Sequence, residues 1–307
     1  MNWKLKAIVQ KTISYAPFSY SINYFFQKFI TKGVVLSDDY FFDRLTHAKQ
    51  HISNYNKWHG NLKGKTTVEL GSGWYPVVPI SCFLCGATNI YSVDIVSLTD
   101  KNKLIDTLKF FIKEKKQLLE YLPSMLNNRI EKVEALLEEE SLLSYEDLLN
   151  ELNLKLIIKD ARNLDFFKKN SVDLIHSNNT FEHVSEKILP EILLEFKRII
   201  KKDGFQSHFI DMSDHFAHSD QNINIYNFLK FTRKQWSIID NTIQPQNRLR
   251  FKDYITMYEN NKIPITEIDF RPGDIHELKK INLAPLFASY SPQELAISHG
   301  YIFSNKF

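Results

Sequence analysis

The chain has 307 residues, of which 43% are hydrophobic, and its formal net charge is +3. This apolar content can fill a sizeable core and excludes global disorder. Basic residues are mixed with acidic ones along the chain and form no cluster, so no nucleic-acid partner is expected. The length favours one α/β domain with added helices.

The N-terminal segment, residues 1–33, is basic and aromatic. The chain contains no run of about 18 apolar residues, so no transmembrane helix is expected. The lack of an export signal predicts a cytoplasmic location. A helix is predicted at about 37–60, and residues 1–60 are predicted to form a helical cap. The alternative for residues 1–33 is an amphipathic anchor on a membrane surface.

Two cysteines, Cys82 and Cys85, are spaced as C-x-x-C within a segment that predicts a buried helix. No second cysteine pair is present. Small core residues are therefore favoured over a redox or zinc site.

A βαβ unit begins the main domain, which is predicted over 61–307. Residues 67–70 predict a strand that ends in Gly71-Ser72-Gly73, and residues 77–85 predict a helix. Residues 89–94 predict a second strand that ends in an acid. The crossover between the strands should be right-handed.

A helical insertion is predicted over residues 100–153, which are rich in leucine, lysine and glutamate. Two or three helices are expected, with Pro123 between the first and the second. The α/β pattern then returns. The remaining predicted elements are strands at 154–158, 172–176, 205–212, 265–270 and 295–304, a helix at 186–201, and a lid or binding loop at 213–250.

The glycine turn and the acid of the next strand, Asp94, suit an adenine nucleoside. Glycines let a ligand approach the backbone, and a carboxylate can accept both ribose hydroxyls. A dinucleotide site would need a third glycine where Pro76 stands. Glu69, within the first strand, suits a cationic ligand. Charge therefore favours S-adenosylmethionine over NAD.

The ordered motifs resemble those of class I methyltransferases of the methyltransferase-11 type. The resemblance covers about residues 62–212, and Trp74-Tyr75-Pro76 departs from the small residues of many relatives. The matching stretches are Val68 to Gly73, Val93-Asp94, Asp160 to Leu164, Val172 to Asn178, Phe181-Glu182-His183-Val184 and Glu195 to Gly204.

This resemblance implies a Rossmann-like sheet of seven strands in the order 3-2-1-4-5-7-6, with S-adenosyl-L-methionine as cofactor. Asp160 would meet the adenine amino group. The implied cofactor-binding residues are Glu69, Gly71, Ser72, Gly73, Asp94, Ile95, Asp160, Ala161 and Asn178.

Downstream stretches at 210–216, 227–229 and 246–250 resemble a bacterial subgroup that modifies small molecules, polysaccharides or secondary metabolites. The implied reaction is methyl transfer to oxygen or nitrogen of a small-molecule acceptor. The insertion would reshape the pocket or mediate contacts in a homodimer.

Candidate general bases are His183, His215 and Asp211. The alternative for His183 is a structural residue that binds backbone at a helix start. The group Asp211, Asp214, His215 and His218 could also hold a divalent ion. It lacks a recognised ligand spacing, and an acid–histidine hydrogen-bond network explains the same residues, so no metal is expected.

Candidate acceptor-binding residues are Arg248, Arg250 and Tyr226. Guanidinium groups pair well with carboxylate or phosphate, with surface ion pairing as the alternative. Tyr226 and the aromatic residues after it could line a pocket, although the core of a lid helix is favoured. The competing functions are an NAD-dependent oxidoreductase or epimerase and a non-catalytic binding protein that kept the fold.

Overall fold

The computed structural model describes residues 2–15, 35–305 and 307. Residues 16–34 lie outside the described residues, and so does most of the segment considered above as a membrane anchor. Among the described helices none combines the length and apolar character needed to cross a membrane.

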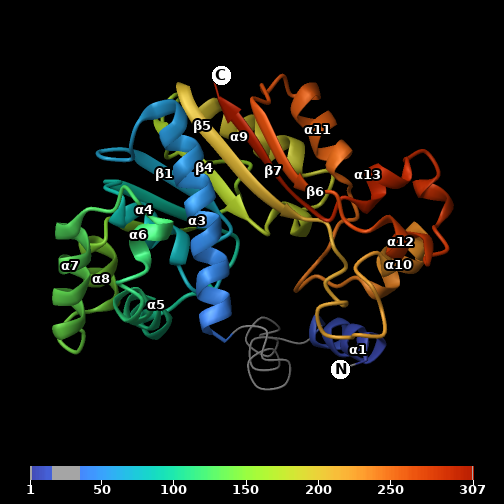
Figure 1. The fold of residues 1–307 in the computed structure, drawn as a ribbon, viewed down its shortest axis with the longest axis horizontal. Coiled ribbons are helices and arrows are strands. Elements are labelled where there is room, and N and C mark those ends of the chain that lie inside the picture. The colour runs from blue at the N-terminus through green and yellow to red at the C-terminus, as the bar shows by residue number, and fades with distance from the viewer. Residues whose placement is uncertain (1, 16–34, 306) are drawn as a thin grey trace. The chain divides into compact units, whose positions relative to one another are not determined.

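The seven strands form one sheet in the order β3-β2-β1-β4-β5-β7-β6, which confirms the predicted order (Figure 1). The pairings β1–β2, β1–β4 and β2–β3 are parallel. The strands are β1 (Thr66–Leu70), β2 (Asn89–Asp94), β3 (Leu154–Ile158), β4 (Val172–Asn178), β5 (Ile200–Asp211), β6 (Glu267–Arg271) and β7 (His299–Asn305).

Helices and short 3₁₀ turns alternate with these strands. The helices are α1 (Trp3–Ile13), α3 (Asp38–His59), α4 (Val77–Leu84), α5 (Lys101–Lys113), α6 (Leu118–Tyr121), α7 (Asn127–Glu138), α8 (Tyr145–Glu151), α9 (Leu189–Ile199), α10 (Arg233–Ile239), α11 (Phe251–Asn260), α12 (Ile275–Lys279) and α13 (Pro292–Ala296). The 3₁₀ turns are η2 (Phe181–His183), η3 (Asn227–Lys230) and η4 (Pro285–Phe287).

The chain divides into two compact units. The first, called here the glycine-loop unit, comprises Leu36–Asn178, Glu191–His208 and Phe303–Phe307. The second, called the histidine unit, comprises the described part of Met1–Val35 together with Asn179–Pro190 and Phe209–Ile302.

In the glycine-loop unit, β1 lies between β2 and β4, and its β-branched sequence suits this buried position. All eight residues of α4 are buried, and α4 contacts α3, β2 and α7. Ser37 caps α3 by accepting a hydrogen bond from the amide of Tyr40, and Gly60 ends the helix at a φ of 86°. The two cysteines are free and buried, in agreement with the core interpretation.

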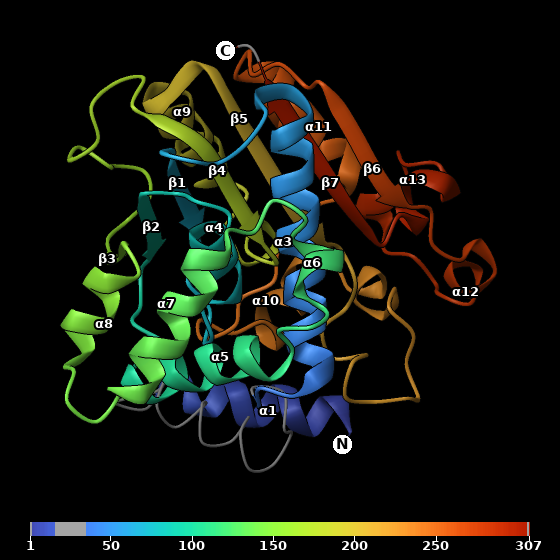
Figure 2. The same cartoon turned by 60° about the vertical axis from the view of Figure 1, so that its left-hand side comes forward.

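The segment 100–153 is helical, as predicted, but it holds four helices, α5 to α8, where two or three were expected (Figure 2). Pro123 follows α6 and therefore separates the second helix from the third. The additional helix is the short α6, which lies between α5 and Pro123.

Two other boundaries differ from the prediction. β5 begins at Ile200, so Gly204 lies inside a strand and does not end a helix. A Cβ at Gly204 would lie 2.6 Å from Cγ1 of Ile200, which explains why glycine stands there. The last predicted strand, 295–304, is α13 followed by β7, because Ser291 caps a helix that starts at Pro292.

In the histidine unit, α1 packs through Trp3 and Ala7 into a buried cluster that includes Phe228, Leu229 and Trp236. The amide of Trp3 donates to Oδ2 of Asp220 at 2.8 Å. Aromatic residues of the segment 213–250, predicted as a lid, are therefore part of a buried core that the segment shares with α1 and with residues 278–296.

Candidate functional site

The glycine turn after β1 has the backbone conformation that glycine alone adopts easily. Gly71 has a φ of 87° and Gly73 a φ of 58°. A Cβ built on Gly73 would meet nothing within 4 Å. The turn thus requires glycine for its conformation and leaves open space beside Gly73.

Asp94 at the end of β2 is joined to this turn. The amide and the hydroxyl of Ser72 both donate to Oδ2 of Asp94, at 2.9 and 3.1 Å, and the amide of Val96 donates to Oδ1 at 3.2 Å. Burial raises the pKa of Asp94, although these hydrogen bonds oppose the rise. The next residue, Ile95, is 69% exposed.

Glu69 lies directly below the turn, in β1, opposite Ser92 and His176 in the neighbouring strands. The hydroxyl of Ser92 donates to its Oε2 at 2.8 Å. Burial raises the pKa of Glu69 to about 8, despite that hydrogen bond and the charge of Arg44. The carboxyl group is therefore largely protonated at neutral pH, and a nearby cation would favour its ionised form.

Asp160 and Asn178 lie at the carboxyl ends of β3 and β4. Arg162 binds the carboxylate of Asp160 through Nε and Nη2, at 2.9 and 2.6 Å from Oδ2, and both side chains are partly exposed. Ala161 is buried. Oδ1 of Asn178 accepts from Nε2 of His51 at 2.7 Å, and burial lowers the pKa of His51 to about 4. Sequence analysis did not single out Arg162 or His51, the partners of these two residues.

The three candidate bases lie together in the histidine unit. Nε2 of His215 lies 3.3 Å from Oδ2 of Asp211, and the rings of His183 and His215 have centroids 5.0 Å apart. Nε2 of His299 lies 3.3 Å from Oδ1 of Asp211. Burial alone would raise the pKa of Asp211, but pairing with His215 and His299 outweighs it and holds the pKa far below its usual range.

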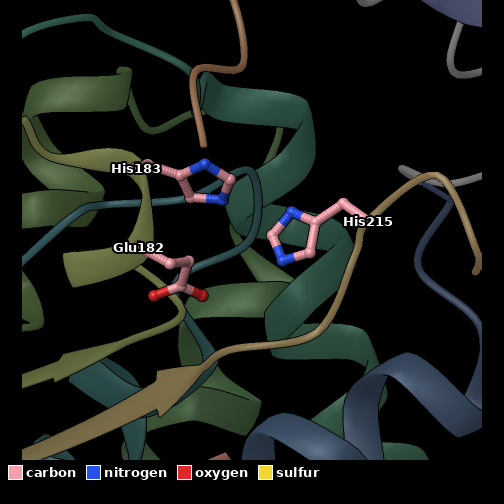
Figure 3. A group of neighbouring side chains, drawn as sticks. All are labelled: Glu182, His183 and His215. Atoms are coloured by element: carbon pink, nitrogen blue, oxygen red, sulfur yellow. The ribbon is translucent and has the colours of Figure 1, made fainter. Parts of the chain in front are cut away.

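A buried glutamate completes the cluster of these histidines. Glu182, His183 and His215 each offer one ligand atom, and the three atoms lie within 4.8 Å of one another. Figure 3 shows the carboxylate of Glu182 and the two imidazole rings turned toward one another. The sequence motif contained Glu182, yet no spacing in the sequence singled it out as a site residue.

Gln246 and Asn247 fix the two segments that carry this cluster. Oε1 of Gln246 accepts from the amide of His215 at 3.3 Å, and its Nε2 donates to the carbonyl oxygen of Ser213 at 2.5 Å. The amide of Asn247 donates to the carbonyl oxygen of Glu182 at 2.7 Å. Its Nδ2 donates to the carbonyl oxygens of Phe181 and Val184, at 2.8 Å each.

The other members of the acid–histidine loop have local partners. Asp214 accepts from Nδ2 of Asn227 at 2.9 Å and from the amide of Phe216 at 2.8 Å. His218 lies 3.1 Å from Oγ of Ser213 through Nε2. Asp214 therefore holds the loop through an asparagine side chain and a main-chain amide.

The residues predicted to bind the acceptor contact the main chain. Nη1 of Arg248 donates to the carbonyl oxygens of Phe228 and Phe231. Arg250 is fully buried and donates to the carbonyl oxygens of Met212, Leu295 and Ile297, at 2.8, 3.2 and 2.6 Å. These contacts correspond to neither a solvent-facing clamp nor a surface ion pair.

Tyr226 is also fully buried. Its hydroxyl donates to the carbonyl oxygen of Ala296 and accepts from the amide of Asp274, both at 2.8 Å. This tyrosine joins three segments of the histidine unit, so its described contacts are structural.

Comparison with known proteins gives one family match. The family model described as "Methyltransferase domain" matches residues 133–204, less than half of the chain. The match begins within α7 and therefore excludes the glycine turn and Asp94. No curated protein sequence matches the chain.

Solved methyltransferase structures resemble this chain at low identity and with TM-scores below 0.5. Geranyl diphosphate C-methyltransferase from Streptomyces coelicolor A3(2) is 11% identical, with 86% of this chain and 79% of that chain covered and a TM-score of 0.46. A phosphoethanolamine N-methyltransferase from Haemonchus contortus is 11% identical, with 84% and 52% covered and a TM-score of 0.46. A putative S-adenosylmethionine-dependent methyltransferase from Listeria monocytogenes is 10% identical, with 85% and 99% covered and a TM-score of 0.41. Likenesses this distant say nothing of the reaction. The chain thus has the sheet order of class I methyltransferases and a methyltransferase-domain match over residues 133–204.

Proposed function

We propose that this protein is a methyltransferase that uses S-adenosyl-L-methionine and methylates an oxygen or nitrogen atom of a small molecule. The proposal rests on the two hydrogen bonds that Ser72 donates to Asp94. They fix the carboxylate at the end of β2 beside the glycine turn that follows β1. The family match supports it.

The cofactor is assigned on charge. S-adenosylmethionine carries a sulfonium and an ammonium group, whereas NAD carries a pyrophosphate. A cation bound near the turn would stabilise the ionised form of Glu69, because its positive charge would offset part of the cost of ionising a buried carboxyl group. Pro76 stands at the N-cap position of α4, and its side chain makes no capping hydrogen bond there. We assign Glu69, Gly71, Ser72, Gly73, Asp94, Ile95, Asp160, Ala161 and Asn178 to the cofactor.

The reaction is a displacement at carbon. A lone pair of the acceptor attacks the methyl carbon, and the carbon–sulfur bond breaks with its electron pair moving to sulfur. A hydroxyl acceptor also loses its proton to a base or to solvent. We assign acceptor activation to the group around Asp211, with His183 and His215, because these side chains gather in one place.

Calorimetry with S-adenosylhomocysteine tests the cofactor assignment. The wild-type protein should bind it with micromolar affinity, and NAD should give no heat. Asp94→Asn should weaken binding at least tenfold, since it removes the charge and keeps the shape. The matched control is Asp165→Asn, which removes an exposed carboxylate that pairs with Lys159. Equal affinity of the wild type and Asp94→Asn would remove the assigned ribose role.

A methyl-transfer screen over sugars, phenols and amines separates an enzyme from a binding protein that kept the fold. Transfer of labelled methyl to any small molecule supports the enzyme. Tight S-adenosylhomocysteine binding with no transfer to any acceptor class would favour the binding protein.

A further inference from the structure

We propose that Glu182, His183 and His215 form a binding site for a divalent transition-metal ion, with Zn²⁺ as the ion that fits best. The three ligand atoms lie within 4.8 Å of one another, and all three residues belong to the histidine unit. Two imidazole nitrogens and one carboxylate oxygen are the ligands of catalytic zinc sites that keep an open coordination position. The sequence predicts no metal here, because the fold alone brings His215 beside Glu182 and His183.

The size of the cluster suits a single ion after a small movement. Ligand atoms lie about 2.0–2.2 Å from Zn²⁺, so two ligands of a tetrahedral ion are roughly 3.4 Å apart. The widest pair here therefore closes by at most roughly 1.4 Å.

One of the two histidines has a hydrogen-bond partner that orients its ring. Nδ1 of His183 donates to the carbonyl oxygen of Pro245 at 2.6 Å, which leaves the lone pair on Nε2 for a metal. A carbonyl partner of this kind fixes the tautomer and ring orientation of a metal-binding histidine. Nε2 of His215 lies 3.3 Å from Oδ2 of Asp211 but forms no hydrogen bond among the described residues.

The main chain that carries the ligands is braced as well. Asn247 binds the backbone of Phe181, Glu182 and Val184, and Gln246 binds the amide of His215. Ligand-bearing segments that are fixed in this way lose little entropy when an ion binds.

The donor set selects the class of ion. Mg²⁺ and Ca²⁺ prefer oxygen ligands, whereas two imidazoles favour zinc and its neighbours in the first transition series. Three protein ligands leave one position for water or for an oxygen atom of a small molecule. Zinc at this position would lower the pKa of a bound water or hydroxyl group.

The test uses the full chain, stripped with a chelator, and measures metal binding without reference to activity. Titration with Co²⁺ should give visible d–d bands that saturate at one equivalent, and Zn²⁺ should displace it. His183→Ala, His215→Ala and Glu182→Gln should each weaken Zn²⁺ binding at least tenfold, measured against a chromophoric chelator.

The matched control is His218→Ala, which alters the same loop at a half-exposed side chain outside the ligand set. It should change Zn²⁺ affinity less than twofold. His215→Cys guards against variants that fail to fold, because a thiolate ligand should add an intense near-ultraviolet charge-transfer band to the Co²⁺ protein. Lack of stoichiometric binding by the wild type, an equal loss in His218→Ala, or no new band in folded His215→Cys would each overturn the site. S-adenosylhomocysteine binding, measured on the same samples, reports on the proposed function separately.

Discussion

Ser72 binds the carboxylate of Asp94 twice, through its amide at 2.9 Å and its hydroxyl at 3.1 Å. The first bond belongs to the backbone and survives any substitution of the side chain, while the second does not. Ser72→Ala should therefore weaken S-adenosylhomocysteine binding by about 1 kcal/mol, or roughly fivefold. Calorimetry checks this, with Ser171→Ala as the control because the hydroxyl of Ser171 binds only the nearby carbonyl oxygen of Lys168 among the described contacts. An unchanged affinity would show that the hydroxyl does not position Asp94.

Two glycines with similar backbone conformation allow the loss of stability caused by a Cβ to be separated from a loss of cofactor binding. Gly73 and Gly64 have φ values of 58° and 74°, and a Cβ at either would meet nothing within 4 Å. Alanine at each position should cost roughly 1–2 kcal/mol of stability, because left-handed backbone strains a residue with a Cβ. Gly73→Ala alone should also weaken S-adenosylhomocysteine binding, by tenfold or more. Urea unfolding and calorimetry on both variants test this, and a similar loss of affinity in Gly64→Ala would assign the effect to general destabilisation.

The pKa of Glu69 gives the stability of the glycine-loop unit a pH dependence. Burial raises that pKa to about 8 from an ordinary value of 4.5, so the folded protein holds a proton that the unfolded chain releases. The free energy of unfolding should therefore fall as the pH rises from about 4.5 to about 8, by roughly 3 kcal/mol at pH 7. Glu69→Gln keeps the shape, removes the ionisation and should flatten this decline.

Urea unfolding at several pH values tests that dependence. Glu131→Gln, which changes an exposed glutamate of α7, should keep the wild-type slope. A slope that persists in Glu69→Gln would show that another group causes it. A saturating cationic cofactor should also shift the titration of Glu69 to lower pH, since a nearby positive charge favours the carboxylate.

Substitution of Arg250 tests whether its guanidinium group stabilises the fold or binds the methyl acceptor. Its three bonds to buried carbonyl oxygens predict that Arg250→Met lowers the free energy of unfolding by at least about 3 kcal/mol, because those oxygens would lose their donors. Arg233→Met, at a mostly exposed side chain, should change it by less than about 0.5 kcal/mol. Denaturant unfolding measures both. A stable Arg250→Met protein with impaired acceptor binding would restore the clamp interpretation.

The fold was largely predictable from the sequence where its signals are local. The strand, glycine turn and helix around Gly71 follow one another directly, and the alternation of strands and helices fixed the class. The start of β5 was not predicted, because Lys201, Lys202 and Gly204 are typical of a helix end. In the structure these residues belong to the strand. At α13 the cap was readable, because Ser291 precedes Pro292 and Glu294 completes a capping box.

Only part of the site could be predicted from the sequence. The residues that were found lie close together in the sequence, whereas those that were missed lie on distant segments. Asp94 and the glycine turn share one βαβ unit, so their meeting follows from topology. Glu182, Gln246 and Asn247 act across segments far apart in the sequence, and no local pattern reports such contacts. The partners of Arg250 are main-chain oxygens, which have no signature in the sequence. Charge alone suggested a clamp for this residue, and burial was the missing information.

Gln246 and Asn247 give the loop between Asp214 and Pro245 fixed ends. The anchoring bonds run from two adjacent residues, so the segment of Glu182 and His183 and the segment of His215 share one attachment point. A change at this point would therefore displace all three side chains together.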